Sequence, residues 1–116
     1  MPPGVILVED SPYESALAYL ALSLTTPLVM QAPDLRSAAR LAPRARLAVL
    51  GPGAMSRISN RLVQSLGIPA VGIGVRVSEA DRRRAFAAGV RAVYERPRGW
   101  KAYLALFEKI HHTVQA

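Results

Sequence analysis

The stretch VILVEDSP, residues 5–12, decides the fold that the rest of the chain must follow. Its first four residues are apolar and three of them are β-branched, which is typical of a short strand covered on both faces of a sheet. Two adjacent carboxylates, Glu9 and Asp10, follow directly. The chain thus places a pair of acids at the end of a buried strand.

A helix is predicted to begin immediately after the acids. Ser11 suits the N-cap, Pro12 suits the first helical position, and Glu14 stands where a capping box has its second member. We therefore interpret Glu14 as a capping residue. The helix is expected to end at the segment 25–27 and to bury a stripe formed by Leu17, Leu20 and Leu24.

Four further apolar runs continue this alternation of strand and helix. They span residues 27–32, 46–50, 68–75 and 90–94. Helix starts are predicted at Asp34 and at a second capping box from Ser78 to Asp81, and helix ends at Gly67 and Gly89. The third helix is expected to carry Ile58, Leu62 and Leu66, and the last helix a stripe of Trp100, Tyr103, Leu104, Phe107 and Ile110.

Five strands that alternate with five helices through short connections predict one α/β domain over residues 1–116, built on a doubly wound parallel sheet. Ligands of such sheets gather at the carboxyl ends of the strands. Glu9 and Asp10 therefore lie at the expected functional edge.

Composition excludes several classes of protein. Hydrophobic residues make up 51% of the chain and charged residues 20%, which indicates a folded globular protein, and the absence of cysteine excludes disulfides and thiolate chemistry. No signal peptide is apparent, and the uncharged run 16–30 is too short to span a bilayer, so we expect a cytoplasmic protein without membrane contact. Because no nucleophile with a base and no cofactor fingerprint is present, we expect no enzymatic activity.

Two segments carry a resemblance to a known family. VILVEDSP at residues 5–12 and IPAVGIGVRVSEADRRRAFAAGVRAVYERP at residues 68–97 resemble the CheY-like receiver domains of bacterial two-component response regulators. The resemblance covers nearly the whole chain and implies a flavodoxin-like fold with strand order 2-1-3-4-5.

The family's phosphorylation site is degenerate here. In receivers the acid pair holds a divalent metal beside an aspartate at the end of the third strand, and that aspartate accepts a phosphoryl group. A Thr or Ser after the fourth strand and a Lys before a cis-proline after the fifth strand sense the phosphate, and an aromatic residue on the fifth strand switches its rotamer. The corresponding positions are Glu9 and Asp10 for the acids, Gly51 for the phosphoacceptor, Gly74 for the hydroxyl, Val93 for the aromatic, and Arg96 followed by Pro97 for the lysine and proline.

These departures predict a pseudo-receiver without phosphotransfer, catalytic residues or cofactor. We hypothesise that Arg96 binds Glu9 or Asp10 and replaces the metal with a cation from the protein. For the two acids, a vestigial or structural role at the strand end is favoured over residual Mg²⁺ binding by Glu9 and Asp10.

The positive charge is concentrated in one window. The chain has a net charge of +7, and residues 82–101 hold seven cations against one carboxylate, Glu95. In receivers this window forms the surface of the fourth helix, fifth strand and fifth helix, which resembling proteins use to bind partners or to dimerise. The predicted partner-binding residues are Arg82, Arg83, Arg84, Arg91, Tyr94, Arg98 and Lys101.

We therefore expect a stand-alone signalling module that contacts a kinase, a regulator or an output protein, with a homodimer through the same surface as a further option. Because 13 of the 15 cations are arginines, a solvated basic surface with no partner is the alternative for this window. Nucleic-acid binding is the second function considered, since the charge suits phosphates and residues 45–74 also resemble an RNA-binding αβα family of the ribosome. Aromatic residues, at 6%, are few for base stacking.

Overall fold

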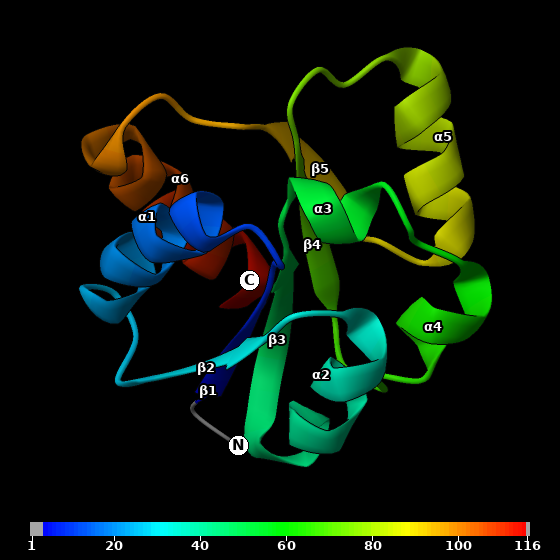
Figure 1. Ribbon diagram of the computed structural model, residues 1–116, viewed down its shortest axis with the longest axis horizontal. Coiled ribbons are helices and arrows are strands. Elements are labelled where there is room, and N and C mark those ends of the chain that lie inside the picture. Colours follow the sequence, from blue (N-terminus) through cyan, green and yellow to red (C-terminus); the bar gives the residue numbers. More distant parts are fainter. Residues whose placement is uncertain (1–3, 116) are drawn as a thin grey trace.

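The computed structural model describes the backbone of residues 4–115 and the side chains of residues 4–112. Its centre is a five-stranded parallel sheet in the order β2-β1-β3-β4-β5, which confirms the predicted topology (Figure 1). The strands are β1 (Gly4–Val8), β2 (Leu28–Ala32), β3 (Ala45–Leu50), β4 (Ala70–Gly74) and β5 (Ala92–Glu95).

Helices cover both faces of the sheet (Figure 1). One face carries α1 (Pro12–Ser23) and α6 (Trp100–Gln115), which pack against each other. The other face carries α2 (Leu35–Leu41), α3 (Pro52–Met55), α4 (Asn60–Gln64) and α5 (Glu79–Ala88), and a 3-10 turn at Ala42–Arg44 leads into β3. Within residues 4–115, no helix is both long enough and apolar enough to cross a bilayer.

The described residues form six α-helices, so the prediction of five was wrong by one. The third predicted helix is divided into α3 and α4. Pro52 starts α3 directly after Gly51, and the Ser59 side chain then accepts a hydrogen bond from Leu62 N (3.3 Å) and begins α4.

The strands separate two hydrophobic cores by simple alternation. Ile6 and Val8 point into the core beneath α2 to α5, together with Leu50. Val5 and Leu7 point to the opposite side, where α1 and α6 supply the remaining apolar groups. Because β1 is buried on both faces, its sequence is continuously apolar, as the fold requires.

Most of the predicted helix boundaries are confirmed. Asp34 accepts from Ser37 N at 2.7 Å, and Ser78 and Asp81 form a reciprocal capping box. Gly67 and Gly89 adopt φ values of +66° and +104°, which glycine tolerates best.

Helix α1 departs from the prediction. The Ser11 side chain makes no capping hydrogen bond, and Glu14 is buried against other partners, so the capping box is wrong. The leucine stripe is wrong as well, because Leu20 and Leu24 are 49% and 61% exposed. Trp100 on α6 is also exposed, although Tyr103, Phe107 and Ile110 of the same predicted stripe are buried.

A buried histidine fixes the amino-terminal edge of the sheet. His111 Nδ1 accepts a hydrogen bond from Arg46 Nη2 on β3 (3.0 Å), which leaves the proton on Nε2. Nε2 then donates toward the hydroxyls of Thr26 (2.8 Å) and Thr25 (3.1 Å), in the connection between α1 and β2. His111 thus joins three segments that are distant in sequence.

Candidate functional site

Glu9 holds together two loops at the carboxyl edge of the sheet. Its side chain is almost fully buried, at 6% exposure for the residue. Oε2 accepts a hydrogen bond from Ser11 N (2.8 Å), and Oε1 accepts one from Gly53 N (2.8 Å). The carboxylate therefore ties the β1–α1 loop to the start of α3.

Gly51 and Gly53 leave the room that these acids occupy. A Cβ atom on Gly51 would overlap Glu9 Oε1 and come within 3.0 Å of Glu9 Cβ. A Cβ atom on Gly53 would overlap Asp10 Oδ1. The position of the expected phosphoacceptor is therefore not an empty hollow, because the Glu9 side chain fills it.

Asp10 is paired with an arginine that the sequence analysis did not single out. Arg57 Nη1 lies 2.9 Å from Asp10 Oδ2, in the segment between α3 and α4. A hydrogen bond with the Glu9 side chain and the charge of Arg57 lower the pKa of Asp10 below its ordinary value. A protein cation is therefore paired with one of the two acids, Asp10, and it comes from Arg57.

The acids do not fit a receiver-type magnesium ion. Such an ion needs carboxylate oxygens that can turn toward it. Both oxygens of Glu9 already accept backbone N–H groups, Asp10 is engaged by Arg57, and residue 51 carries no side chain. Among the described residues, no group of three or more His, Cys, Asp or Glu side chains could hold a metal ion.

Arg96 binds Glu14, so the predicted pairing with Glu9 or Asp10 is wrong. Arg96 Nη1 donates to Glu14 Oε1 at 2.6 Å, and the buried Tyr103 hydroxyl donates to Glu14 Oε2 at 2.9 Å. Burial and the hydrogen bond to Glu14 raise the pKa of Tyr103. Glu14 is thus a site residue that bridges α1, α6 and the loop after β5, and its interpretation as a cap is wrong.

The remaining family positions lie near one another at the same edge. Gly74 O accepts a hydrogen bond from Arg96 N (2.7 Å), and a Cβ atom on Gly74 would come within 2.9 Å of Val77 Cγ2. A cavity of about 250 Å³ lies beside Gly74 and Val93, where receivers carry a hydroxyl and an aromatic ring. No cis peptide bond occurs in residues 4–115, so the bond before Pro97 is trans.

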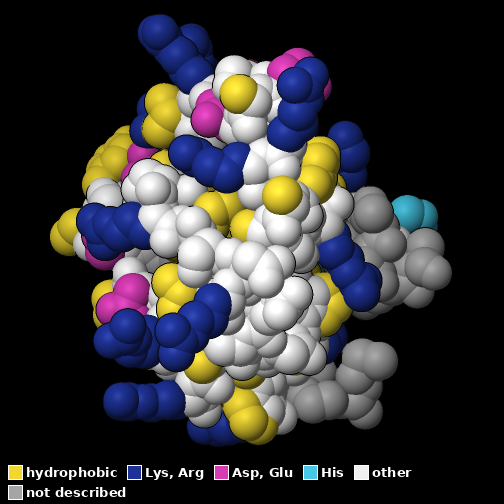
Figure 2. All heavy atoms as spheres, turned by 90° about the vertical axis from the view of Figure 1, so that its right-hand side faces the viewer, with side chains coloured by type: hydrophobic (Ala, Val, Ile, Leu, Met, Phe, Trp, Pro, Cys, Tyr) yellow, Lys and Arg dark blue, Asp and Glu magenta, His cyan; other side chains and the backbone are white. Residues whose placement is uncertain are grey.

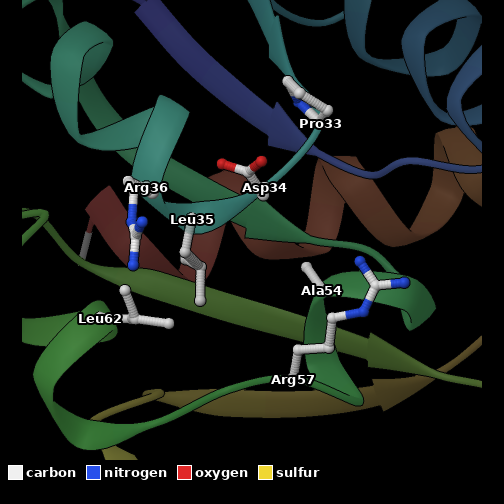
Figure 3. A pocket seen from close by; sticks show the side chains of 7 residues that line it. All are labelled: Pro33, Asp34, Leu35, Arg36, Ala54, Arg57 and Leu62. Atoms are coloured by element: carbon white, nitrogen blue, oxygen red, sulfur yellow. The ribbon is translucent and has the colours of Figure 1, made fainter.

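A second cavity, of about 240 Å³, lies between the start of α2 and the segment from α3 to α4. Figure 3 shows Leu35 and Ala54 between the side chains of Arg36 and Arg57. The sequence analysis did not predict this cavity, because it expected one continuous helix where the structure has α3 and α4.

The seven predicted partner-binding residues are not all free to meet a partner. Arg82 Nη1 donates to Val93 O (2.8 Å), and Arg84 lies 3.7 Å from Asp81. Tyr94 is partly buried and lies beneath the Lys109 ammonium group, 5.8 Å from the centre of its ring. The exposed members are Arg83, Arg84, Arg91, Arg98 and Lys101.

Lys and Arg side chains outnumber acids on the face that α4 and α5 form (Figure 2). The basic window itself is divided by the fold, because α5 and α6 lie on opposite faces of the sheet and β5 is the edge strand between them (Figure 1). We call the surface formed by α5, β5 and the start of α6 the basic face.

No family model and no curated protein matches the chain. Solved structures do match it. CheY4, the chemotaxis response regulator of Vibrio cholerae, is 18% identical over 95% of this chain and 99% of its own, with a TM-score of 0.74. The phosphorylated cyanobacterial phytochrome response regulator RcpA is 17% identical over 100% and 96%, with a TM-score of 0.76. HP1043, an orphan response regulator of H. pylori, is 16% identical over 96% and 95%, with a TM-score of 0.73. The chain therefore has the receiver fold of CheY-like response regulators.

Proposed function

We propose that the protein is a pseudo-receiver of two-component-type signal transduction, which is not phosphorylated and acts in the cytoplasm by protein contact through the basic face. The observation that carries this proposal is the Glu9 carboxylate, which occupies the space of the missing side chain at Gly51.

Phosphoryl transfer to a receiver needs a carboxylate nucleophile and cations that neutralise the charge of the transferred group. Gly51 offers no nucleophile, and a phosphoryl group at this position would meet the buried carboxylate of Glu9. Arg57 and Arg96 are engaged by Asp10 and Glu14. These contacts support a fixed site without a step of group transfer.

Acetyl phosphate with Mg²⁺, followed by intact-mass measurement, tests the absence of phosphorylation. We expect no phosphoryl adduct, while a phosphorylatable receiver treated in parallel gains one. A stable adduct on this chain would overturn the proposal. A calorimetric Mg²⁺ titration should likewise give no saturable heat.

An acidic surface of a kinase, a regulator or an output protein is the partner that suits the basic face. Arg83, Arg84 and Arg91 are exposed, and the chain carries a net charge of +7. Two copies of this face would oppose arginine to arginine, so electrostatics favours an acidic partner over a homodimer through this face.

A further inference from the structure

Helix α1 is more apolar on its exposed side than on its buried side. Its core side presents Ala18, Ala21, Leu22 and the Glu14 carboxylate. Its exposed or partly exposed side presents Tyr13, Ala16, Leu17, Tyr19, Leu20 and, just past its end, Leu24, with Ser15 and Ser23 as the polar members. Tyr13 is 71% exposed, and Leu20 and Leu24 are about half exposed or more. A contiguous apolar helix face of this kind marks an interaction site.

This face is also uncharged, in contrast to the rest of the surface. Glu14 is the only charged residue of α1, and it is buried and bound to Arg96 and Tyr103. Elsewhere in the described chain, α2, α4 and α5 each expose arginines and α6 exposes lysines. A second copy of a chain with net charge +7 therefore meets the least repulsion at α1.

The two ends of the α1 face differ in charge. At the amino end, Tyr13 and Leu17 line a cavity of about 340 Å³ together with the exposed Arg98. At the carboxyl end, Leu24 lines a shallow, open depression together with the exposed Glu108. Within residues 4–112, neither Arg98 nor Glu108 forms an ion pair.

We propose that a second copy of this chain docks on α1, with the two α1 helices antiparallel about a two-fold axis near Tyr19 and Leu20. In this arrangement the amino end of each α1 meets the carboxyl end of the other, so Arg98 of each copy faces Glu108 of its partner. The apolar face supplies the burial, and the two ion pairs set the orientation.

The size of the face limits the affinity. A helix of 12 residues is about 18 Å long, and one helix face with its rim covers less than the roughly 800 Å² per partner of a standard interface. We therefore expect a dimer that dissociates on dilution. This dimer would form whether or not the basic face has a signalling partner, so each proposal can fail alone.

Sedimentation velocity of the full chain over a concentration series tests the dimer. The variant L20E/L24E should weaken association at least about 100-fold, because it buries charges in an apolar interface and places the two residue-20 acids opposite each other at the axis. V75E/F86E is the matched control: Val75 and Phe86 are 55% and 49% exposed, lie outside α1, and undergo the same change of charge. Circular dichroism checks that both variants fold.

A charge exchange tests the orientation. R98E or E108R alone should weaken the dimer about fivefold, and R98E/E108R should restore it, since each ion pair is re-formed with opposite polarity. A chain that stays monomeric to millimolar concentration, a dimer that survives L20E/L24E, or a dimer that only V75E/F86E disrupts would each overturn the proposal. Failure of the double exchange to restore association would overturn the antiparallel arrangement.

Discussion

Glu9 and Gly51 depend on each other. Glu9 can turn back to bond the amides of residues 11 and 53 only because residue 51 has no side chain in its way. A change of Gly51 alone to aspartate would therefore not recreate a phosphorylation site. It would first displace the group that joins the two loops.

Gly51→Ala should lower the free energy of unfolding by about 1–3 kcal/mol, because the new methyl group meets the Glu9 carboxylate in a packed site. Urea denaturation measures the loss. Glu9→Ala alone should also destabilise the fold, since two backbone N–H groups lose a charged acceptor.

The double variant G51A/E9A tests whether the loss of stability in Gly51→Ala comes from the contact with Glu9 or from any side chain placed at residue 51. It should lose less free energy of unfolding than the two single losses added together, because the alanine at residue 9 removes the overlap with the carboxylate and leaves only the approach of the two Cβ atoms. Strict additivity would show that the two positions do not interact.

Tyr103 should contribute to stability in a pH-dependent way. Its pKa is raised in the folded state above the ordinary value of 10.0, so the stabilisation is complete below pH 10 and is lost as the pH rises further. Tyr103→Phe should cost about 1.5–3 kcal/mol near neutral pH through the lost hydrogen bond to a carboxylate.

Urea unfolding of the parent chain and Tyr103→Phe below and above pH 10 measures the difference in their free energies of unfolding. This difference should be smaller at the higher pH. Tyr13→Phe is the control, because Tyr13 is exposed and should show no difference at either pH. A Tyr103→Phe cost that stays constant through the alkaline range would contradict the assignment.

Among single elements, the sequence predicted where the strands lie better than it predicted which side of each helix faces the core. Each strand is a short apolar run between turn residues, and a run buried on both faces needs no further information. Helix α1 was misjudged because it carries apolar residues on every side, so spacing alone could not show which side faces the core. The pattern Ser11-x-x-Glu14 fits a capping box, but it cannot reveal that Arg96 and Tyr103 would compete for the carboxylate.

The candidate site was predicted in part for the same reason. The order of strands fixed where the acids, Gly51 and Gly74 would meet, and the structure brings them to one edge. The partner of Asp10 could not be predicted, because Arg57 lies in a break between α3 and α4 where the sequence analysis expected one continuous helix.

The hydrogen bonds between His111 on α6 and the threonines of the α1–β2 connection should be weakened at acidic pH. Burial and Arg46 lower the pKa of His111 below its ordinary 6.5, so the neutral ring stabilises the fold above that pH and the stabilisation is lost as the pH falls. The free energy of unfolding should therefore fall below pH 6.5 in the parent chain, and His111→Gln should reduce this dependence.

His112→Gln supplies the comparison, since His112 is exposed on the same helix. Urea unfolding near pH 7.5 and pH 5.5 separates the two variants. An equal pH dependence in His111→Gln and the parent chain would show that His111 is not the responsible group.

For the whole molecule, the location of charge matters more than its amount. The affinity for a specific partner of the basic face should fall at least about tenfold in R83E/R84E. The variant R36E/R40E makes the same change of charge on α2 and should keep the parent affinity. The measurement is enrichment of the partner from native extract, followed by titration of the purified pair.

Nucleic-acid binding predicts a different result. Both double variants would then weaken binding alike, and affinity for DNA or RNA would fall steeply with salt. Gel shifts with DNA and RNA at low and physiological salt test this. A nucleic-acid complex that persists at physiological salt would contradict the proposed protein contact.

The hydrogen bond from Arg82 to Val93 O has a consequence for how this molecule can meet others. β5 is an edge strand, and unpaired carbonyls along such an edge invite a further strand from another chain. The guanidinium occupies one of these carbonyls and places a cation across the edge. A visiting peptide strand would have to displace this guanidinium to pair with Val93, so the hydrogen bond opposes extension of the sheet at this edge.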